Sequence, residues 1–213
     1  MRRVLEPEVM DTEEESIAYE AMDHHVVNGA FVDRLVERGA NGRMLDLGTG
    51  PAHIPVLVCE RIPSAHVVAT DLADTMLSLA RARIARARLS HKVELVKVDV
   101  KKLPFEDRAF DVVFSNTVLH HLPDPRPFLR EAVRVLRPEG ILMIRDLRRP
   151  ETEAELLALV EKHTANDSAG QRALFRASLC ASFTPAELWE LDRELALGAQ
   201  VVVTTDRHVT LER

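Results

Sequence analysis

The chain has 213 residues, of which 46% are hydrophobic and 29% charged, with a formal net charge of −6. This length and apolar content are sufficient for one domain with a full hydrophobic core. The negative net charge indicates no broad basic surface, so we expect no nucleic-acid partner. No apolar run approaches the ~18 residues of a membrane span, and the first 16 residues lack the apolar core of a signal peptide. We therefore expect a cytoplasmic protein, as a monomer or a homodimer.

The first 40 residues predict two helices that together form an N-terminal lid. The first, over residues 11–22, carries acidic residues at its start, where the positive end of the helix dipole lies. The second, over residues 26–38, places apolar side chains on one face at i, i+4, i+8 spacing. Tyr19 is the only tyrosine of the chain, and Asp23 follows it by one helical turn. Both are candidate catalytic residues, because this spacing lets them face one ligand.

A glycine turn follows the first predicted strand, in the sequence MLDLGTGPAHIPV of residues 44–56. The apolar run stops at Asp46, the chain turns through Gly48 and Gly50, and apolar residues resume at Ile54. This order is typical of a strand, a tight turn and a helix that build a nucleotide site at the carboxyl end of a strand. Glycines let the backbone bend sharply and approach a ligand closely.

Four further strands are predicted, over residues 66–71, 93–100, 109–116 and 141–146. The first three end at or near a polar residue, namely Asp71, Asp99 and Asn116. Together with Asp46, these polar tips are expected at one edge of a parallel sheet. Asp71 follows Gly48 by 23 residues, and an acid at about this distance suits the hydroxyls of a ribose. The segment 137–140 is expected to turn the chain into the last of these strands.

The remaining chain predicts a helical cover and two closing strands. Arg145 and Asp146 end the fifth strand near the expected cleft. Thr184, Pro185 and Glu187 form an N-cap signal for a third helix. The expected elements are helices over 151–163, 169–180 and 184–197 and strands over 201–205 and 208–211. The single domain thus divides into a lid (1–40), a core (41–150) and a cover with a closing hairpin (151–213).

Two histidine pairs, at residues 24–25 and 120–121, raise the question of a metal. Adjacent side chains on an α-helix point about 100° apart, and no acidic or cysteine partner stands at a metal-like spacing. The sequence therefore predicts no metal site. His120 follows Asn116 by one helical turn, which makes it a candidate general base.

The motifs taken in order resemble those of class I S-adenosylmethionine-dependent methyltransferases. The segments that carry the resemblance are LDLGTGPA, VVATDLADTML, VKVDVKKLPF, FDVVFSNTVLHHLPDP and LRPEGILMIRD, within about residues 40–150. The small-molecule enzymes of ubiquinone and menaquinone biosynthesis are the most similar type. The resemblance implies a Rossmann-like, doubly wound α/β fold, with a mostly parallel seven-stranded sheet and an antiparallel C-terminal strand. The third glycine of the family pattern is Ala52 here, a replacement that this packing position tolerates.

The resemblance also implies S-adenosyl-L-methionine as cofactor and assigns its contacts. The glycine turn would meet the methionine part, Asp71 the ribose, Leu72 and Met76 the faces of the adenine, and Asp99 its amine. The full set of cofactor-binding candidates is Asp46, Gly48, Thr49, Gly50, His53, Asp71, Leu72, Met76, Asp99, Val100 and Asn116. The candidate catalytic residues are Tyr19, Asp23, Asn116 and His120.

Three functions are compatible with these motifs. The first is methyl transfer to a small-molecule substrate by in-line displacement. The second is a cyclase or lyase that converts the cofactor itself into azetidine-2-carboxylate and methylthioadenosine, because the chain has only short additions beyond the core. The third is a cofactor-binding protein without turnover. A nicotinamide enzyme is disfavoured, because the third glycine of its G-x-G-x-x-G pattern would fall on His53.

Overall fold

Seven strands form one sheet in the order β3-β2-β1-β4-β5-β7-β6 in the computed structural model, which describes residues 1–6 and 25–213. The first five strands are parallel, and β7 runs antiparallel to both β5 and β6. The strands are β1 (Arg43–Leu47), β2 (His66–Asp71), β3 (Val93–Lys97), β4 (Phe110–Asn116), β5 (Leu136–Leu147), β6 (Gln200–Val203) and β7 (His208–Glu212). The predicted fold class, including the antiparallel C-terminal strand, is confirmed.

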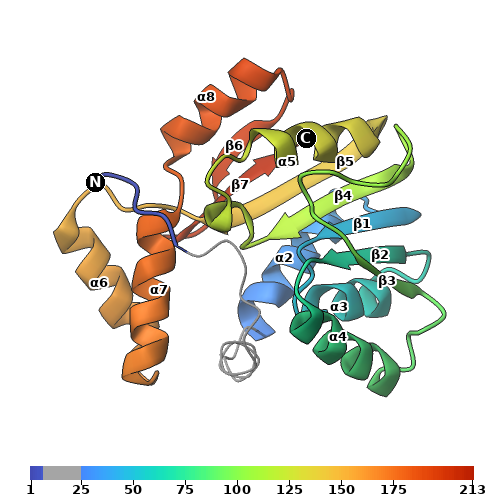
Figure 1. Cartoon of the computed structure of the whole chain (residues 1–213), viewed down its shortest axis with the longest axis horizontal. Coiled ribbons are helices and arrows are strands. Elements are labelled where there is room, and N and C mark those ends of the chain that lie inside the picture. The colour runs from blue at the N-terminus through green and yellow to red at the C-terminus, as the bar shows by residue number, and fades with distance from the viewer. Residues whose placement is uncertain (7–24) are drawn as a thin grey trace.

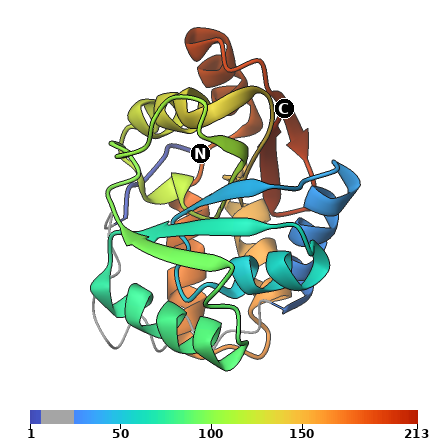
Figure 2. The same cartoon turned by 90° about the vertical axis from the view of Figure 1, so that its right-hand side faces the viewer.

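Helices cover both faces of the sheet and one of its ends (Figures 1 and 2). The helices are α2 (His25–Glu37), α3 (His53–Arg61), α4 (Asp74–Arg86), α5 (Arg126–Val135), α6 (Glu153–His163), α7 (Ala169–Ala181) and α8 (Pro185–Leu195). A core of α2, α3 and α4 side chains lies on one face, and a second core, with α5 and α8, lies on the other. The α6–α7 pair lies beyond the carboxyl ends of the parallel strands (Figure 1). Among the described residues, no helix has the length and apolar character needed to cross a membrane.

The central strands are largely buried and mostly apolar because both faces of the sheet are covered. Successive side chains of a strand point to opposite faces. In β1, Met44 belongs to the core beneath α2 and α3, and Leu45 belongs to the core beneath α5. In β4, Phe114 and Val113 divide in the same way.

Two of the predicted strand boundaries are wrong by three residues or more. β3 ends at Lys97 instead of residue 100, so Asp99 lies in the loop beyond the strand. β5 begins at Leu136 instead of residue 141, and the segment expected to be a turn is part of this strand. The cause is tertiary: the buried Leu136 pairs with Phe110, and a register shift precedes the regular pairing from Val112 onward. The glycine and proline of this segment therefore accompany an irregularity within a strand.

Because of the irregularity in β5, we expect Gly140→Ala to destabilise the protein. A Cβ at Gly140 would lie 2.8 Å from the backbone oxygen of Asp111, so the substitution should lower the free energy of unfolding by about 1–3 kcal/mol. Gly170→Ala is the matched control, because a Cβ there meets only Ser168 Oγ at 3.9 Å. This control should leave stability unchanged or raise it by up to about 1 kcal/mol. Urea unfolding measures both, and equal effects would contradict the close approach at Gly140.

Candidate cofactor site

A pocket of about 770 Å³, which includes space open to solvent, lies at the carboxyl ends of the parallel strands. Its position is the one expected for ligands of an open α/β sheet, where the strand order reverses between β1 and β4. The lining residues are Gly48, Asp71, Leu72, Ala73, Met76, Asp99, Val100, Lys101, Asn116, Thr117, Val118, His121 and Leu122. Seven of the predicted cofactor-binding residues are among them. Asp71, Asp99 and Asn116, which were predicted at strand tips, thus line this pocket, and Asp46 does not.

The glycine turn after β1 is fixed to the end of β2. The backbone N–H groups of Gly48 and Thr49 both donate to the carbonyl oxygen of Thr70, over 2.9 and 2.8 Å. Gly48 has φ +75°, and a Cβ at this position would lie 2.4 Å from Val118 Cγ2. Both the backbone conformation and the contact with Val118 require glycine here.

Asp71 joins the same turn to the pocket. Its Oδ2 accepts a hydrogen bond from the Gly50 N–H over 2.7 Å, and its Oδ1 accepts one from the Ala73 N–H over 3.0 Å. An ionised carboxylate only accepts hydrogen bonds, which is what the hydroxyls of a ribose would require. Asp71 lines the pocket, and it is thus suited to the paired hydroxyls of a ribose.

The side of the pocket that the sequence resemblance assigns to adenine combines apolar walls with one acid. Leu72, Met76 and Val100 line it. Lys101 donates to Asp99 Oδ1 from its backbone N–H over 2.9 Å, and its Nζ lies 3.0 Å from the same oxygen. Burial alone would raise the pKa of Asp99, but these contacts with Lys101 outweigh it and lower the pKa. Asp99 is therefore ionised at neutral pH and acts as an acceptor.

Asn116 is oriented by Arg145 at the end of the neighbouring strand β5. Arg145 Nε donates to Asn116 Oδ1 over 2.7 Å, and Arg145 Nη1 donates to the carbonyl oxygen of Val27 over 3.0 Å. The guanidinium carbon lies 4.6 Å from the ring centroid of Phe31. An arginine only donates, so the amide oxygen of Asn116 faces Arg145 and its NH₂ group remains for a ligand.

The other predicted site residues do not line this pocket. Asp46 and Thr49 are buried beneath the turn, with 2% and 8% of their surfaces exposed. Gly50 contacts Asp71 through its N–H group. A ring nitrogen of His53 lies 3.2 Å from Arg83 Nη2, next to α4. Tyr19, Asp23 and the predicted helix over 11–22 lie outside the described residues.

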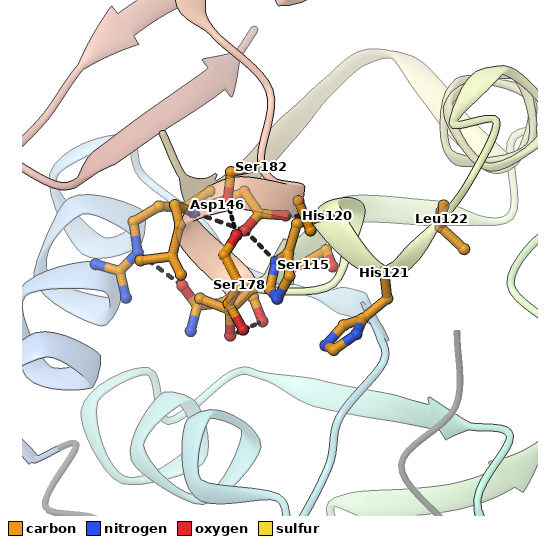
Figure 3. Close-up of polar contacts among 12 residues, drawn as sticks. Ser115, His120, His121, Leu122, Asp146, Ser178 and Ser182 are labelled. Atoms are coloured by element: carbon orange, nitrogen blue, oxygen red, sulfur yellow. Dashed lines mark hydrogen bonds and ion pairs between the residues drawn. The ribbon is translucent and has the colours of Figure 1, made fainter. Parts of the chain in front are cut away.

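His120 and His121 lie in a short 3₁₀ turn (Leu119–His121) instead of the expected α-helix. His120 is only 3% exposed, and its Nδ1 lies 2.6 Å from Asp146 Oδ1. Its backbone N–H donates to the second oxygen of the same carboxylate over 2.8 Å. His121, which was not among the predicted site residues, is the member of the pair that lines the pocket. The rings lie side by side, with centroids 4.1 Å apart (Figure 3).

Glu6 joins this pair from the other end of the sequence. Its Oε1 lies 3.2 Å from His120 Nε2 and 3.0 Å from His121 Nδ1. Burial would lower the pKa of His120, but the carboxylates of Asp146 and Glu6 outweigh it and raise the pKa to about 9. Sequence spacing offered no signal for Glu6, because more than 110 residues separate it from both histidines.

We expect the buried carboxyl of Asp46 to make the free energy of unfolding depend on pH. Burial, together with the negative charge of Asp71, raises the pKa of Asp46 to about 7, so the fold favours the protonated carboxyl. This contribution is complete below pH ~4 and is lost as the pH rises through about 7. Asp46→Asn mimics the protonated form, so its unfolding free energy relative to wild type should increase between these values. Urea unfolding of the ligand-free protein measures this, and a difference constant with pH would contradict it.

Comparison with known proteins gives a family match for part of the chain. Residues 45–144 match the family model described as a methyltransferase domain. Demethylmenaquinone methyltransferase of Listeria monocytogenes is 37% identical over 116 residues, which are 54% of this chain and 48% of the relative. Malonyl-[acyl-carrier protein] O-methyltransferase of Legionella pneumophila is 39% identical over 114 residues, or 54% of this chain and 39% of the relative. The chain thus spans about half the length, or less, of these curated relatives.

A solved structure extends the similarity of the fold to nearly the whole chain. A putative S-adenosyl-L-methionine-dependent methyltransferase from Methanococcus maripaludis superposes with a TM-score of 0.73, at 15% identity, over 98% of this chain and 96% of that one. The sheet order and the antiparallel β7 agree with this similarity. Residues 45–144 are thus similar in sequence to the methyltransferase domain family, and the fold of the chain agrees with that similarity.

Proposed function

We propose that the protein transfers a methyl group from S-adenosylmethionine to a small-molecule acceptor. The observation that supports this most directly is the composition of the pocket along its length. We assign Asp71 to the ribose hydroxyls and Leu72 and Met76 to the faces of the purine, since all three line the pocket, as do Asn116 and His121. The residues present therefore fit the cofactor of the family. The proposed location is the cytoplasm.

The cofactor supplies an electrophilic methyl group, and the side chains mainly have to orient the reactants. Asn116, held by Arg145, offers its NH₂ group toward the pocket. We place His121 next to the acceptor in preference to His120, because His121 lines the pocket and His120 is buried between Asp146 and Glu6. In this arrangement His120 is a positioning residue. Tyr19 and Asp23 remain predicted contributors from the N-terminal segment.

The names of the relatives support the class of acceptor that we propose. By their names, the two curated relatives are a demethylmenaquinone methyltransferase and a malonyl-[acyl-carrier protein] O-methyltransferase. Neither relative covers the whole chain at high identity, so we propose only a small acceptor that enters beside His121. Quinols, phenols and carboxylates are the first compounds to test.

Asp71→Asn tests cofactor binding. The substitution keeps an acceptor for one N–H group but removes the charge that a ribose hydroxyl would meet. A charged hydrogen bond contributes about 1.5–3 kcal/mol, so the affinity for S-adenosylhomocysteine should fall roughly 10- to 100-fold. Isothermal titration calorimetry measures it.

Asp74→Asn is the matched control, because this carboxylate lies three residues further on and is largely exposed. The affinity of the Asp74→Asn variant for S-adenosylhomocysteine should equal that of the wild type. If the wild-type chain binds neither the cofactor nor its product, the proposed function is wrong.

Product analysis separates the three reactions. With S-adenosylmethionine alone the protein should form no methylthioadenosine, whereas a suitable acceptor should release S-adenosylhomocysteine and gain one methyl group. Mass spectrometry detects both nucleosides. Methylthioadenosine without an acceptor would identify a cyclase or lyase instead. Tight binding with neither product, over quinols, phenols and carboxylates, would favour a binding protein.

A further inference from the structure

We propose that Glu6, His120 and His121 bind one divalent transition-metal ion beside the cofactor pocket. An open coordination position of this ion would take an oxygen of the acceptor. Metal binding itself does not depend on the proposed methyl transfer, but the contact with the acceptor rests on it. This inference replaces the expectation of no metal site, which considered only neighbours in the sequence.

Three suitable ligand atoms converge on one point. Glu6 Oε1 lies 3.2 Å from His120 Nε2 and 3.0 Å from His121 Nδ1, and one ligand atom from each residue lies within 4.8 Å of the others. Ligands bound at about 2.0–2.1 Å around a tetrahedral ion are roughly 3.3 Å apart. A small movement of these side chains thus creates a coordination site. Figure 3 shows both imidazole rings on the same side of the 3₁₀ turn.

Asp146 supplies the outer partner that a metal-binding histidine usually has. Its Oδ1 lies 2.6 Å from His120 Nδ1, which leaves Nε2 of the same ring to face Glu6. Such a carboxylate fixes the tautomer of the ring and raises the basicity of the ligating nitrogen. Asp146 is itself fixed, because it accepts the backbone N–H groups of His120 and Leu147 over 2.8 and 2.6 Å.

The carboxylate of Glu6 is also held in place before any ion binds. Ser178 Oγ on α7 lies 3.2 and 3.3 Å from its two oxygens. Arg3 Nη2, three residues earlier, donates to the carbonyl oxygens of His120 and Leu122 over 3.1 and 2.9 Å. The segment that carries Glu6 and the turn that carries the histidines are therefore joined directly. This preorganisation lowers the entropic cost of assembling the ligands.

The donor set indicates which ions fit. Two imidazoles and one carboxylate suit zinc, iron(II), cobalt(II) and related ions, and three protein ligands leave positions open. His121 both belongs to the cluster and lines the pocket. An acceptor hydroxyl or carboxylate entering the pocket is thus within reach of the ion. There, the ion would favour the ionised, more nucleophilic form of the oxygen.

Metal titration tests the proposal against the alternative that the cluster is only a set of ion pairs. The chelator-treated chain should bind about one equivalent of Zn²⁺ in calorimetry. Co²⁺ should give visible absorption bands of a site with nitrogen ligands. Glu6→Gln and His121→Gln should weaken binding at least tenfold, and Asp146→Asn should weaken it roughly 10- to 100-fold. His91→Gln, at an exposed histidine, is the control and should bind as the wild type does.

The same variants separate this proposal from the methyl-transfer proposal. Glu6→Gln should bind S-adenosylhomocysteine as the wild type does but bind the metal ion more weakly. Asp71→Asn should bind S-adenosylhomocysteine more weakly but bind the metal ion as the wild type does. Thermal unfolding checks that each variant is folded, and the Co²⁺ spectrum of the wild type tests the ligands without any substitution. Failure of the wild type to bind Zn²⁺ or Co²⁺, or equal metal affinity in folded Glu6→Gln, would overturn the site.

Discussion

The pocket depends on the connection between the glycine turn after β1 and the end of β2. One carbonyl oxygen, that of Thr70, accepts the N–H groups of Gly48 and Thr49, and the Thr70 hydroxyl donates to the carbonyl oxygen of Asp46. Thr70 is fully buried, so the surrounding core fixes its position. The core thus positions the turn directly, and the turn holds Asp71 through the N–H of Gly50. A ligand meets groups already in place, which reduces the entropy lost on binding.

The order of the elements was predictable from local patterns, but their irregular parts were not. The strands β2 and β4 are short, largely apolar runs that end in a polar residue, and β2 (His66–Asp71) has the bounds that were predicted for it. The sequence of β5 contains a proline and a glycine, which locally favour a turn. Its pairing with Phe110 and the burial of Leu136 keep this segment in the strand. A contact between residues 26 positions apart in the sequence decides this boundary, and no local pattern reports it.

The same distinction applies to the site. Asp71 and Asn116 were predictable because the ends of neighbouring parallel strands meet at one edge, and Asp99 still reaches the pocket from the loop beyond its strand. The choice between His120 and His121 was not predictable. It depends on which ring Asp146 holds in the interior, and that partner lies on β5. No sequence pattern indicated Glu6, because it reaches the site only through the packing of a distant segment.

The long-range contacts of this N-terminal segment bear on how the molecule folds. Arg3 bonds to carbonyl groups 117 and 119 residues further along the chain, and Ser178 lies 172 residues from Glu6. Closing such large loops costs entropy before the contacts repay it. The parallel sheet and α7 must be in place to offer these partners. Docking of residues 1–6 is therefore expected to be a late event in folding, and a nearly complete sheet precedes a complete site.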